Sequence, residues 1–325
     1  MNVVITGAGG FLGSHLAVRL KLHGHHVTGI DLKDPEFSPR ACDVFRHADL
    51  RERLDPRWLD GAERVYALAA DMGGMGYIHA NGGKILHDNL LIDVNTLEAA
   101  SEARVGRLLY ASSACVYNED AQATDGARPL READAYPAKP DTDYGWEKLT
   151  AERLCAAYRR ERGLLTTSVR FHNVYGPCGT WRGGREKVPA ALCRKVAVAK
   201  LLGRDHVEVW GDGQQRRSFL FIGDFLDGVE RLMESGHPGP VNLGTDRSAS
   251  VDELRGIVLA AARFECEVRH VEGPVGVRGR NSDNALMTSV AGGWSPVTPL
   301  EEGIAATYAW VEQQVREAVD RGEDV

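Results

Sequence analysis

The sequence lacks the features that mark disulfide-bonded and zinc-binding proteins. Its six cysteines, at positions 42, 115, 155, 178, 193 and 266, include no C-x-x-C pair and no regular series of spacings. Neither a disulfide framework nor a zinc site is therefore indicated. The histidines at positions 23, 25 and 26 lie together, but no second group of ligands is near them in the sequence, and a solvated cluster is the commoner outcome. No metal site is expected.

Long apolar runs and an excess of positive charge are missing as well. No run approaches the roughly 18 apolar residues that a membrane-spanning helix needs, and no targeting segment is recognisable before the first expected strand. The formal net charge is -7, and the basic residues are scattered. These features argue against nucleic acid and membrane as partners. We expect a cytoplasmic protein with reduced thiols that acts on a small molecule.

What the sequence does contain, from Met1 to about Phe171, is an alternation of short apolar runs with helical patterns, which is typical of β-α-β units and a parallel sheet. The runs are nearly continuous in apolar residues, as in strands that are covered on both faces. The pattern predicts an α/β fold with a doubly wound parallel sheet. The expected strands are residues 2–6, 27–30, 64–69, 108–112 and 168–171.

After Val174 the alternation gives way to Gly/Pro-rich loops and short elements, which favours a second, smaller α/β domain. Residues 240–244 again have the pattern of a buried strand, so the chain is expected to return to the first sheet. We expect residues 1–173 to form the doubly wound domain, rejoined by about 218–262, and residues 174–325 to form mainly the smaller domain. Helices at 84–103 and 144–162 carry more apolar surface than one sheet contact requires, which favours a homodimer.

A glycine-rich turn follows the first strand. Gly7, Gly10 and Gly13 have the spacing G-x-x-G-x-x-G between a strand and a helix, where the backbone can approach a pyrophosphate at the helix N-terminus. Alone, this pattern is also that of a tight turn. Asp31 ends the second strand, where a carboxylate can accept both hydrogen bonds of an adenosine ribose. Because a carboxylate there repels a 2′-phosphate, the sequence predicts NAD rather than NADP as cofactor.

Tyr144 and Lys148 lie four residues apart, on one face of an expected helix. A neighbouring cation stabilises phenolate and lowers the pKa of a tyrosine, which would make Tyr144 a base near neutral pH. A solvated pair on an amphipathic helix would look the same. However, Ser113 ends a buried parallel strand, and ligands of doubly wound sheets bind at the carboxyl ends of strands. The serine can therefore reach the same site.

These three motifs together resemble the extended short-chain dehydrogenases/reductases, the NAD-dependent epimerase/dehydratase family. The resemblance implies that Tyr144 removes or returns a sugar hydroxyl proton, Lys148 binds the nicotinamide ribose, and Ser113 orients the substrate hydroxyl. It also implies a set of residues that contact NAD. Besides Tyr144 and Lys148, these are Gly7, Gly10, Phe11, Leu12, Gly13, Asp31, Asp49, Leu50 and Ala69.

Longer stretches resemble the GDP-mannose 3,5-epimerases within that family. They are D-M-G-G-M-G at 71–76, S-S-A-C at 112–115, G-G-R-E-K at 183–187 and V-R-G-R-N-S-D-N at 277–284. The resemblance implies the nucleotide sugar GDP-mannose as substrate, with inversion at C5 and also at C3. The implied substrate contacts are Gly73, Gly74, Met75, Ser113, Ala114, Cys115, Asn173, Glu186, Lys187, Lys195, Gln215, Arg217 and Arg278.

The implied chemistry can be rebuilt from the groups present. Oxidation at C4 makes the hydrogens on C3 and C5 acidic, and inversion then needs a base on one face and an acid on the other. Cys115 lies two residues beyond Ser113, on the same side of an extended strand, and its thiolate could abstract a proton. Lys187 lies in a basic, glycine-rich loop and could return a proton from the opposite face. The resemblance makes these two residues the acid/base pair.

Simpler interpretations of these residues remain. A cysteine near a strand end is usually a small buried apolar residue, and a lysine beside Arg185 and Glu186 is usually a solvated ion pair. Arg217 and Arg278 suit a diphosphate because a guanidinium matches phosphate bidentately, although they could be surface charge. Asn118, Cys178 and Arg216 replace the proline, the bulkier residue and the small residue of the family pattern.

Other functions share the same oxidative first step. A nucleotide-sugar 4-epimerase, a dehydratase and a reductase are alternatives, and a non-catalytic sensor of nucleotide sugars is a further one. Related dehydratases carry a carboxylate at the place of Cys115, which argues against dehydration.

Overall fold

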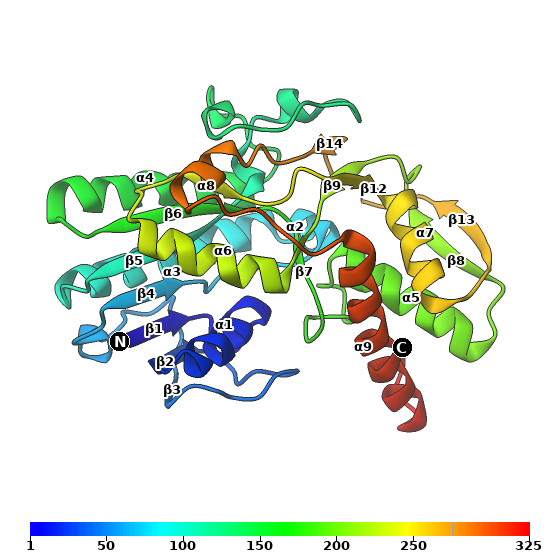
Figure 1. Ribbon diagram of the computed structural model, residues 1–325, viewed down its shortest axis with the longest axis horizontal. Coiled ribbons are helices and arrows are strands. Elements are labelled where there is room, and N and C mark those ends of the chain that lie inside the picture. Colours follow the sequence, from blue (N-terminus) through cyan, green and yellow to red (C-terminus); the bar gives the residue numbers. More distant parts are fainter. Residues whose placement is uncertain (275) are drawn as a thin grey trace.

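The computed structural model describes residues 1–274 and 276–325. A seven-stranded sheet dominates the molecule (Figure 1), and all of its neighbouring strands are parallel. The strands, in their order across the sheet, are β11 (Val241–Leu243), β6 (Thr166–Phe171), β5 (Arg107–Ser113), β4 (Arg64–Ala67), β1 (Asn2–Thr6), β2 (His26–Asp31) and β3 (Val44–His47). This order confirms the predicted doubly wound parallel sheet.

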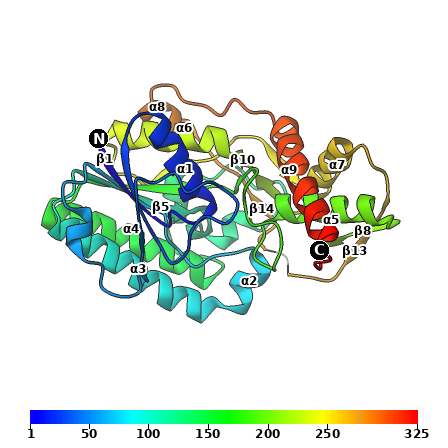
Figure 2. The same cartoon turned by 90° about the horizontal axis from the view of Figure 1, so that it is seen from below.

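The strands are apolar on both faces because helices cover both. In β1, Val3 and Ile5 pack into one core, and Val4 packs into the other. Helices α1 (Phe11–Leu22), α6 (Ile222–Ser235) and α8 (Ala285–Val290) lie on the first side, and α3 (Gly82–Glu102) and α4 (Asp143–Arg162) lie on the second (Figure 2).

Helices α3 and α4 lie side by side and begin and end within two residues of their predicted bounds. Thr142 caps α4, because its hydroxyl accepts a hydrogen bond from the Gly145 N–H at 3.2 Å. Gly163, with φ +71°, ends the helix in the left-handed conformation that glycine adopts without strain. Apolar side chains on the two helices are exposed, among them Leu91 and Trp146. The homodimer through these helices stays a prediction.

A second group of elements lies beside the sheet (Figure 1). Its helices are α5 (Val188–Leu202), α7 (Val251–Ala262) and α9 (Leu300–Asp320). They share one apolar core. Its short strands are β8 (His206–Trp210), β9 (Arg216–Ser218), β12 (Ser248–Ser250), β13 (Glu267–Val271) and β14 (Gly279–Arg280), and the pair β7 (Val174–Tyr175) and β10 (Leu220–Phe221) adjoins them.

The chain crosses between the two groups more than once. It leaves the sheet after β6 and returns with α6 and β11, so the strand expected at 240–244 does pair with β6. Helix α7 instead packs against α5 and α9. The division of the chain into domains stays a prediction.

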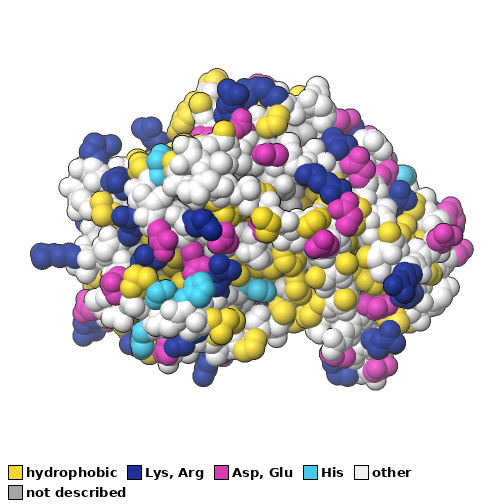
Figure 3. Space-filling view, in the orientation of Figure 1, with side chains coloured by type: hydrophobic (Ala, Val, Ile, Leu, Met, Phe, Trp, Pro, Cys, Tyr) yellow, Lys and Arg dark blue, Asp and Glu magenta, His cyan; other side chains and the backbone are white. Residues whose placement is uncertain are grey.

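The molecular surface carries charges of both signs. Basic and acidic side chains intermingle on the face drawn in Figure 3. Within the described ranges, none of the helices has an apolar stretch long enough to cross a bilayer.

Candidate active site

A crevice for a dinucleotide lies at the carboxyl ends of β1 and β4, where the sheet's strand order reverses direction. Gly7 follows β1 with φ +75°, and a Cβ there would lie 2.7 Å from the Ala69 backbone nitrogen beyond β4. A Cβ at Gly13 would lie 2.1 Å from the Gly7 carbonyl oxygen. Only glycine fits at these two positions, and the turn closes tightly under the crevice.

Helix α1 begins in this crevice. Gly10 is its N-cap and has no side chain to bond the first turn, whose N–H groups lack partners within a helix. Asp31, at the end of β2, accepts hydrogen bonds from the Gly9 N–H at 2.9 Å and the Lys33 N–H at 3.2 Å. Its carboxylate is thereby fixed in direction, with lone pairs remaining for ribose hydroxyls. The described residues therefore fit NAD.

The other expected NAD contacts lie at the start of α1 and in the segment after β3. Phe11 and Leu12 open α1, and Phe11 packs beneath the chain at Gly179, where a Cβ would lie 3.4 Å from its ring. Leu50 is buried, and its carbonyl oxygen accepts a hydrogen bond from the Asn95 side chain at 3.0 Å. Asp49 is held by an ion pair to a nearby residue, Arg51.

Lys148 is enclosed in the protein together with two carboxylates. Its ammonium lies 3.2 Å from Glu147 Oε1 and 4.0 Å from Asp93 Oδ2, and it donates to the Tyr110 hydroxyl at 3.1 Å. Burial acts against its charge, but Asp93 and Glu147 outweigh burial and raise the pKa of Lys148. Burial also raises the pKa of Glu147 to about 8, against the effect of Lys148.

The pKa of Tyr144 differs from the expectation drawn from the Tyr-Lys spacing. Lys148 does lower it, with the ammonium 5.7 Å from the ring centroid, and Ser113 lowers it further. Burial is the larger effect, and the pKa of Tyr144 is raised. The lowered pKa expected from the Tyr-Lys spacing is therefore not found for the protein alone, and the role of Tyr144 as a base stays a prediction. The reason is that the enclosed site and Glu147 offset what the cation contributes.

Ser113 and Cys115 adjoin each other, but not along a strand. Strand β5 ends at Ser113, and residues Ala114–Val116 form one turn of 3-10 helix. Ser113 caps this turn, since its hydroxyl accepts a hydrogen bond from the Cys115 N–H at 3.1 Å. The expected extended strand is therefore wrong, although the turn still keeps the two residues adjacent.

Cys115 lies among cationic side chains from three other parts of the chain. Arg280, on β14, donates to its sulfur at 3.0 Å. Burial lowers the pKa of Lys187, and an electrostatic interaction with Cys115 partly offsets this. Arg217, on β9, has its pKa lowered to about 10 by burial and by the charge of Arg280, against the effect of Cys115. The expected acid/base pair, Cys115 and Lys187, thus interacts electrostatically, and Arg217 and Arg280 add positive charge to its surroundings.

The glycine-rich loop 183–187 is fastened to the segment after β4. Arg185 stacks on the ring of Tyr77 at 3.9 Å and donates to the Tyr77 hydroxyl at 2.6 Å and to Asp71 Oδ1 at 2.8 Å. The Gly74 N–H donates to the Arg185 carbonyl at 3.1 Å. The loop therefore contacts the segment that leads into α2 (Met75–Ala80). Gly73 and Gly74 lie in that segment, and Met75 is the first residue of the helix.

Three further expected substrate residues lie near this loop or the sheet edge. Ala114 is buried beside Cys115. Asn173 has φ +23° and donates to the Ser218 carbonyl at 3.1 Å. Glu186 forms an ion pair with Arg194 at 3.1 Å, which ties the loop to α5.

Two further expected substrate residues, Lys195 and Gln215, contact Trp210, and a third, Arg278, pairs with two carboxylates. Lys195 lies over the Trp210 ring and donates to the Glu208 carbonyl at 2.8 Å, and Gln215 donates to the Trp210 carbonyl at 3.4 Å. Arg278 is held by Asp125 at 2.7 Å and Asp212 at 2.9 Å. A diphosphate would compete with these two carboxylates for the donor groups of Arg278.

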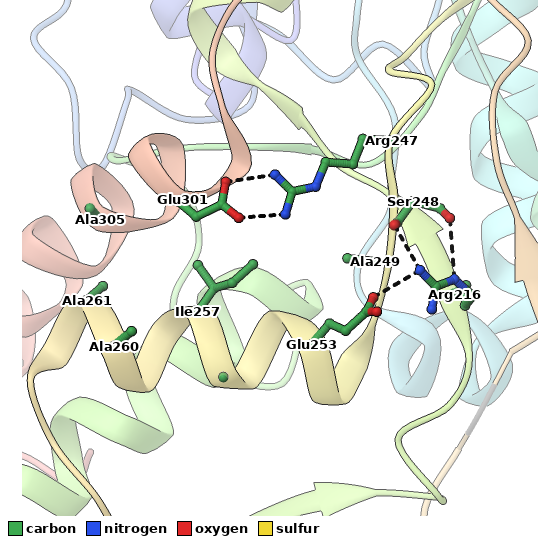
Figure 4. A pocket seen from close by; sticks show the side chains of 11 residues that line it. Arg216, Arg247, Ser248, Ala249, Glu253, Ile257, Ala260, Ala261, Glu301 and Ala305 are labelled. Atoms are coloured by element: carbon green, nitrogen blue, oxygen red, sulfur yellow. Dashed lines mark hydrogen bonds and ion pairs between the residues drawn. The ribbon is translucent and has the colours of Figure 1, made fainter.

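A groove of about 610 Å³ lies away from this site, between α7 and α9 (Figure 4). Arg216 and Arg247 line it, and each points to a glutamate, Glu253 at 3.0 Å and Glu301 at 2.5 Å. The residues expected to carry the chemistry are not among its lining. The volume of this groove therefore gives no information about the reaction. Arg216, which replaces the small residue of the family pattern, lines this groove with its side chain.

The other two residues that differ from the family pattern, Asn118 and Cys178, affect only their own surroundings. Asn118 accepts from the Asp120 N–H at 2.9 Å and donates to the Pro137 carbonyl at 2.8 Å. Cys178 has φ +62°, a conformation that side chains rarely adopt.

Sequence reasoning missed Arg280, which contacts Cys115, and singled out Arg278 two residues earlier. The stretch R-G-R-N contains both arginines, and nothing in the local pattern tells which one is buried. Arg280 is 5% exposed, whereas Arg278 lies on the surface.

Comparisons with known proteins agree with this geometry. The model of the NAD dependent epimerase/dehydratase family matches residues 3–244. The GDP-mannose 3,5-epimerase of Arabidopsis thaliana is 44% identical over 100% of this chain and 86% of its own length.

Two solved structures are also similar. One is an NAD dependent-NDP-hexosamine 5,6-dehydratase involved in tunicamycin biosynthesis, with 30% identity and a TM-score of 0.81 over 95% of this chain and 97% of that one. The other is the UDP-glucose 4-epimerase of Thermus thermophilus in complex with NAD, with 25% identity and a TM-score of 0.81 over 96% and 99%. The chain belongs to the NAD dependent epimerase/dehydratase family, as a homologue of GDP-mannose 3,5-epimerases with NAD as its cofactor.

Proposed function

We propose that this protein epimerises GDP-mannose at C5 and at C3, giving GDP-L-gulose and GDP-L-galactose. The observation that carries the proposal is the place of Cys115 in the turn that Ser113 caps, with Lys187 and Tyr144 both interacting electrostatically with it. A thiol and an amine that interact in this way can supply a base and an acid for inversion at carbon. The 44% identity with a GDP-mannose 3,5-epimerase over the whole chain supports the same substrate.

The cofactor would be held by the turn at Gly7–Gly13, by Asp31 and by Lys148. Bound NAD would supply the reversible oxidation of C4 and, in its oxidised form, a positive charge near Tyr144. The backbone N–H groups at the start of α1 would bind the diphosphate. Asp31 would accept the ribose hydroxyls, and Lys148 would orient the second ribose.

Tyr144 takes the proton from the C4 hydroxyl and later returns it, while Ser113 orients that hydroxyl. Because burial raises the pKa of Tyr144 in the protein alone, added positive charge is needed for the phenolate to form. Cys115 then removes the proton from C5, which the C4 ketone has made acidic. Lys187 donates a proton to the opposite face, and its lowered pKa makes that donation easier. Repetition at C3 needs the same groups, after Cys115 has released its proton to solvent and Lys187 has taken one up.

The substrate's nucleotide diphosphate would extend from this pocket toward Arg217 and Arg278. Incubation with GDP-mannose and identification of the products tests the proposal directly. Products inverted at C5 or C3 support it. A sugar inverted only at C4, or one that has lost water, would instead assign the chain to an alternative reaction.

A further inference from the structure

Two buried carboxylates face the ammonium of Lys148. Asp93 comes from α3 and Glu147 from α4, and the exposed fractions of Asp93, Glu147 and Lys148 are 4%, 0% and 2%. Charges taken out of water are costly unless opposite charges balance them. One ammonium balances one carboxylate, so the second carboxylate either holds a proton or is balanced by a further positive charge.

Asp93 is the carboxylate that the fold satisfies. Its Oδ2 accepts a hydrogen bond from the Tyr110 hydroxyl at 2.8 Å, and the same hydroxyl accepts one from Lys148 at 3.1 Å. The ammonium lies 4.0 Å from Oδ2. A hydroxyl has one hydrogen, so its donation to Asp93 leaves its oxygen to accept from Lys148. Asp93 therefore acts through Tyr110 to fix the direction of the ammonium.

Glu147 is the carboxylate that the fold leaves unsatisfied. Its Oε1 lies 3.2 Å from the Lys148 ammonium, but neither of its oxygens accepts a well-aligned hydrogen bond from the residues that the structure describes. The pKa of Glu147 is raised to about 8, because burial and Asp93 outweigh the effect of Lys148. Near neutral pH, Glu147 therefore carries the proton of this cluster in the protein alone.

The groups that face Glu147 come from three elements. Lys148 and Tyr144 lie on α4 itself, Asp93 lies on α3, and Tyr110 lies on β5. Lys148 is the cation among these groups, and Asp93 already offsets its charge. A further positive charge that enters this enclosure would favour the ionised form of Glu147.

We propose that Glu147 and Asp93 supply the negative charge that makes the cofactor site favour oxidised NAD over NADH. The nicotinamide ring is positively charged when oxidised and uncharged when reduced, whereas the rest of the two nucleotides is the same. The inference deepens the proposed function and rests on it in one respect, that Lys148 orients the ribose that carries this ring. Reduction of the ring by the C4 hydride removes its positive charge, so the two carboxylates favour return of the hydride to the sugar.

The preference should depend on pH through Glu147. Where Glu147 holds a proton in the protein alone, binding of the oxidised ring releases that proton, and binding of the reduced ring does not. A ligand whose binding releases a proton binds more tightly as the pH rises. The ratio of bound NAD to bound NADH should therefore rise about fivefold or more between about pH 7 and about pH 9, on either side of the pKa of Glu147.

The test is a competition between the two nucleotides for the purified enzyme. The enzyme is equilibrated without sugar in an equal excess of NAD and NADH until the composition of the bound fraction is constant. The bound nucleotides are then released and quantified by chromatography at each pH. Glu147→Gln keeps the shape of the side chain without its charge. Its ratio should not rise with pH, and at about pH 9 it should be about tenfold lower than that of the wild type.

Asp93→Asn should change the profile in a different way. Asp93 raises the pKa of Glu147, so without its charge the rise in the ratio should occur about one pH unit lower. This arm decides the question if Glu147→Gln does not fold. Glu98→Gln is the matched control, because it removes a carboxylate of the same helix that pairs with Arg162 at the surface. Its profile should match that of the wild type.

The proposal is overturned if the wild-type ratio does not change with pH, if folded Glu147→Gln retains the wild-type rise, or if Asp93→Asn has the wild-type profile. It is supported if the rise is lost in the first variant and moved to lower pH in the second. Because no sugar is present, this result does not depend on the reaction. A failure of the proposed function would be seen separately, in the products formed from GDP-mannose.

Discussion

The carboxylate of Asp31 accepts a hydrogen bond from the Gly9 N–H at 2.9 Å, so the end of β2 is joined to the turn after β1. The same carboxylate would bind the adenosine ribose, and its charge would repel a 2′-phosphate. Asp31→Ala should weaken NAD about tenfold or more, because hydrogen bonds to a charged group are lost. It should also reduce the preference for NAD over NADP. Titration of cofactor-stripped protein with both nucleotides measures this.

Asp31→Asn is the matched control for that experiment. It keeps an acceptor for the Gly9 N–H and removes the charge, so the turn should keep its shape while NADP binds better than in the wild type. Unchanged discrimination in both variants would show that another group selects the cofactor.

Tyr144→Phe and Lys187→Ala should fail at different steps. Without the Tyr144 hydroxyl, the C4 proton has no acceptor, and oxidation should stop. Without Lys187, oxidation should proceed and inversion should be impaired. Addition of GDP-mannose should therefore produce an NADH absorbance in Lys187→Ala that is missing in Tyr144→Phe. The reverse pattern would exchange the roles assigned to these residues.

The clamp formed by Arg185, Tyr77 and Asp71 should matter for inversion more than for oxidation. Arg185→Met removes the stacking and both side-chain hydrogen bonds, and so loosens the loop that presents Lys187, although its backbone and Glu186 contacts remain. Displacement of a reacting group by about 1 Å can cost up to about 100-fold in rate, and we expect a loss of about tenfold or more.

Arg182→Met is the control for Arg185→Met, because it removes a neighbouring arginine that pairs with Glu323 instead. Deuterium exchange at C5 and formation of NADH, measured side by side, separate inversion from oxidation. Equal losses of both in Arg185→Met would mean that the clamp serves folding and not the placement of Lys187.

His172 should make the protein less stable in mild acid. It is fully buried, burial lowers its pKa to about 3, and its Nε2 lies 3.2 Å from Asn242 Oδ1. The unfolded chain binds a proton at this histidine below about pH 6.5, whereas the folded chain does not until about pH 3. Its contribution to stability is therefore complete above pH 6.5 and is lost as the pH falls. The loss is about 1.4 kcal/mol per pH unit, or about 2 kcal/mol at about pH 5.

Urea unfolding near pH 7 and near pH 5 tests this for the wild type and for His172→Gln. Glutamine can donate to Asn242 and does not titrate, so the variant should lose about 2 kcal/mol less than the wild type between the two conditions. Equal losses would assign the acid sensitivity to other groups.

The sequence predicted best those features that depend on neighbouring residues. The turn at Gly7 and the place of Asp31 follow from spacing within one β-α-β unit, and α3 and α4 follow from long helical patterns. Strand β3 was not predicted, because it has four residues, V-F-R-H, and lies at the sheet edge with half of them exposed. A short, partly polar segment carries too little pattern to be recognised.

The features that depend on burial could not be predicted. The sequence could not distinguish Arg280 from Arg278, since only the fold places one against Cys115 and the other between two surface carboxylates. The pKa of Tyr144 is set by its enclosure and by Glu147 as well as by Lys148. Burial is the largest of these effects and depends on groups distant in the sequence, which local spacing does not contain.

The central claim is that Cys115 removes a proton from the carbon next to C4. Its most direct test is the reaction in heavy water, followed by NMR of the sugar. Wild-type enzyme should place solvent deuterium at C5 and also at C3. In Cys115→Ser, whose hydroxyl is a far weaker acid, exchange should fall by about 100-fold or more, while NADH formation on adding GDP-mannose should persist. Exchange at the wild-type rate in Cys115→Ser would contradict the account and make the cysteine structural.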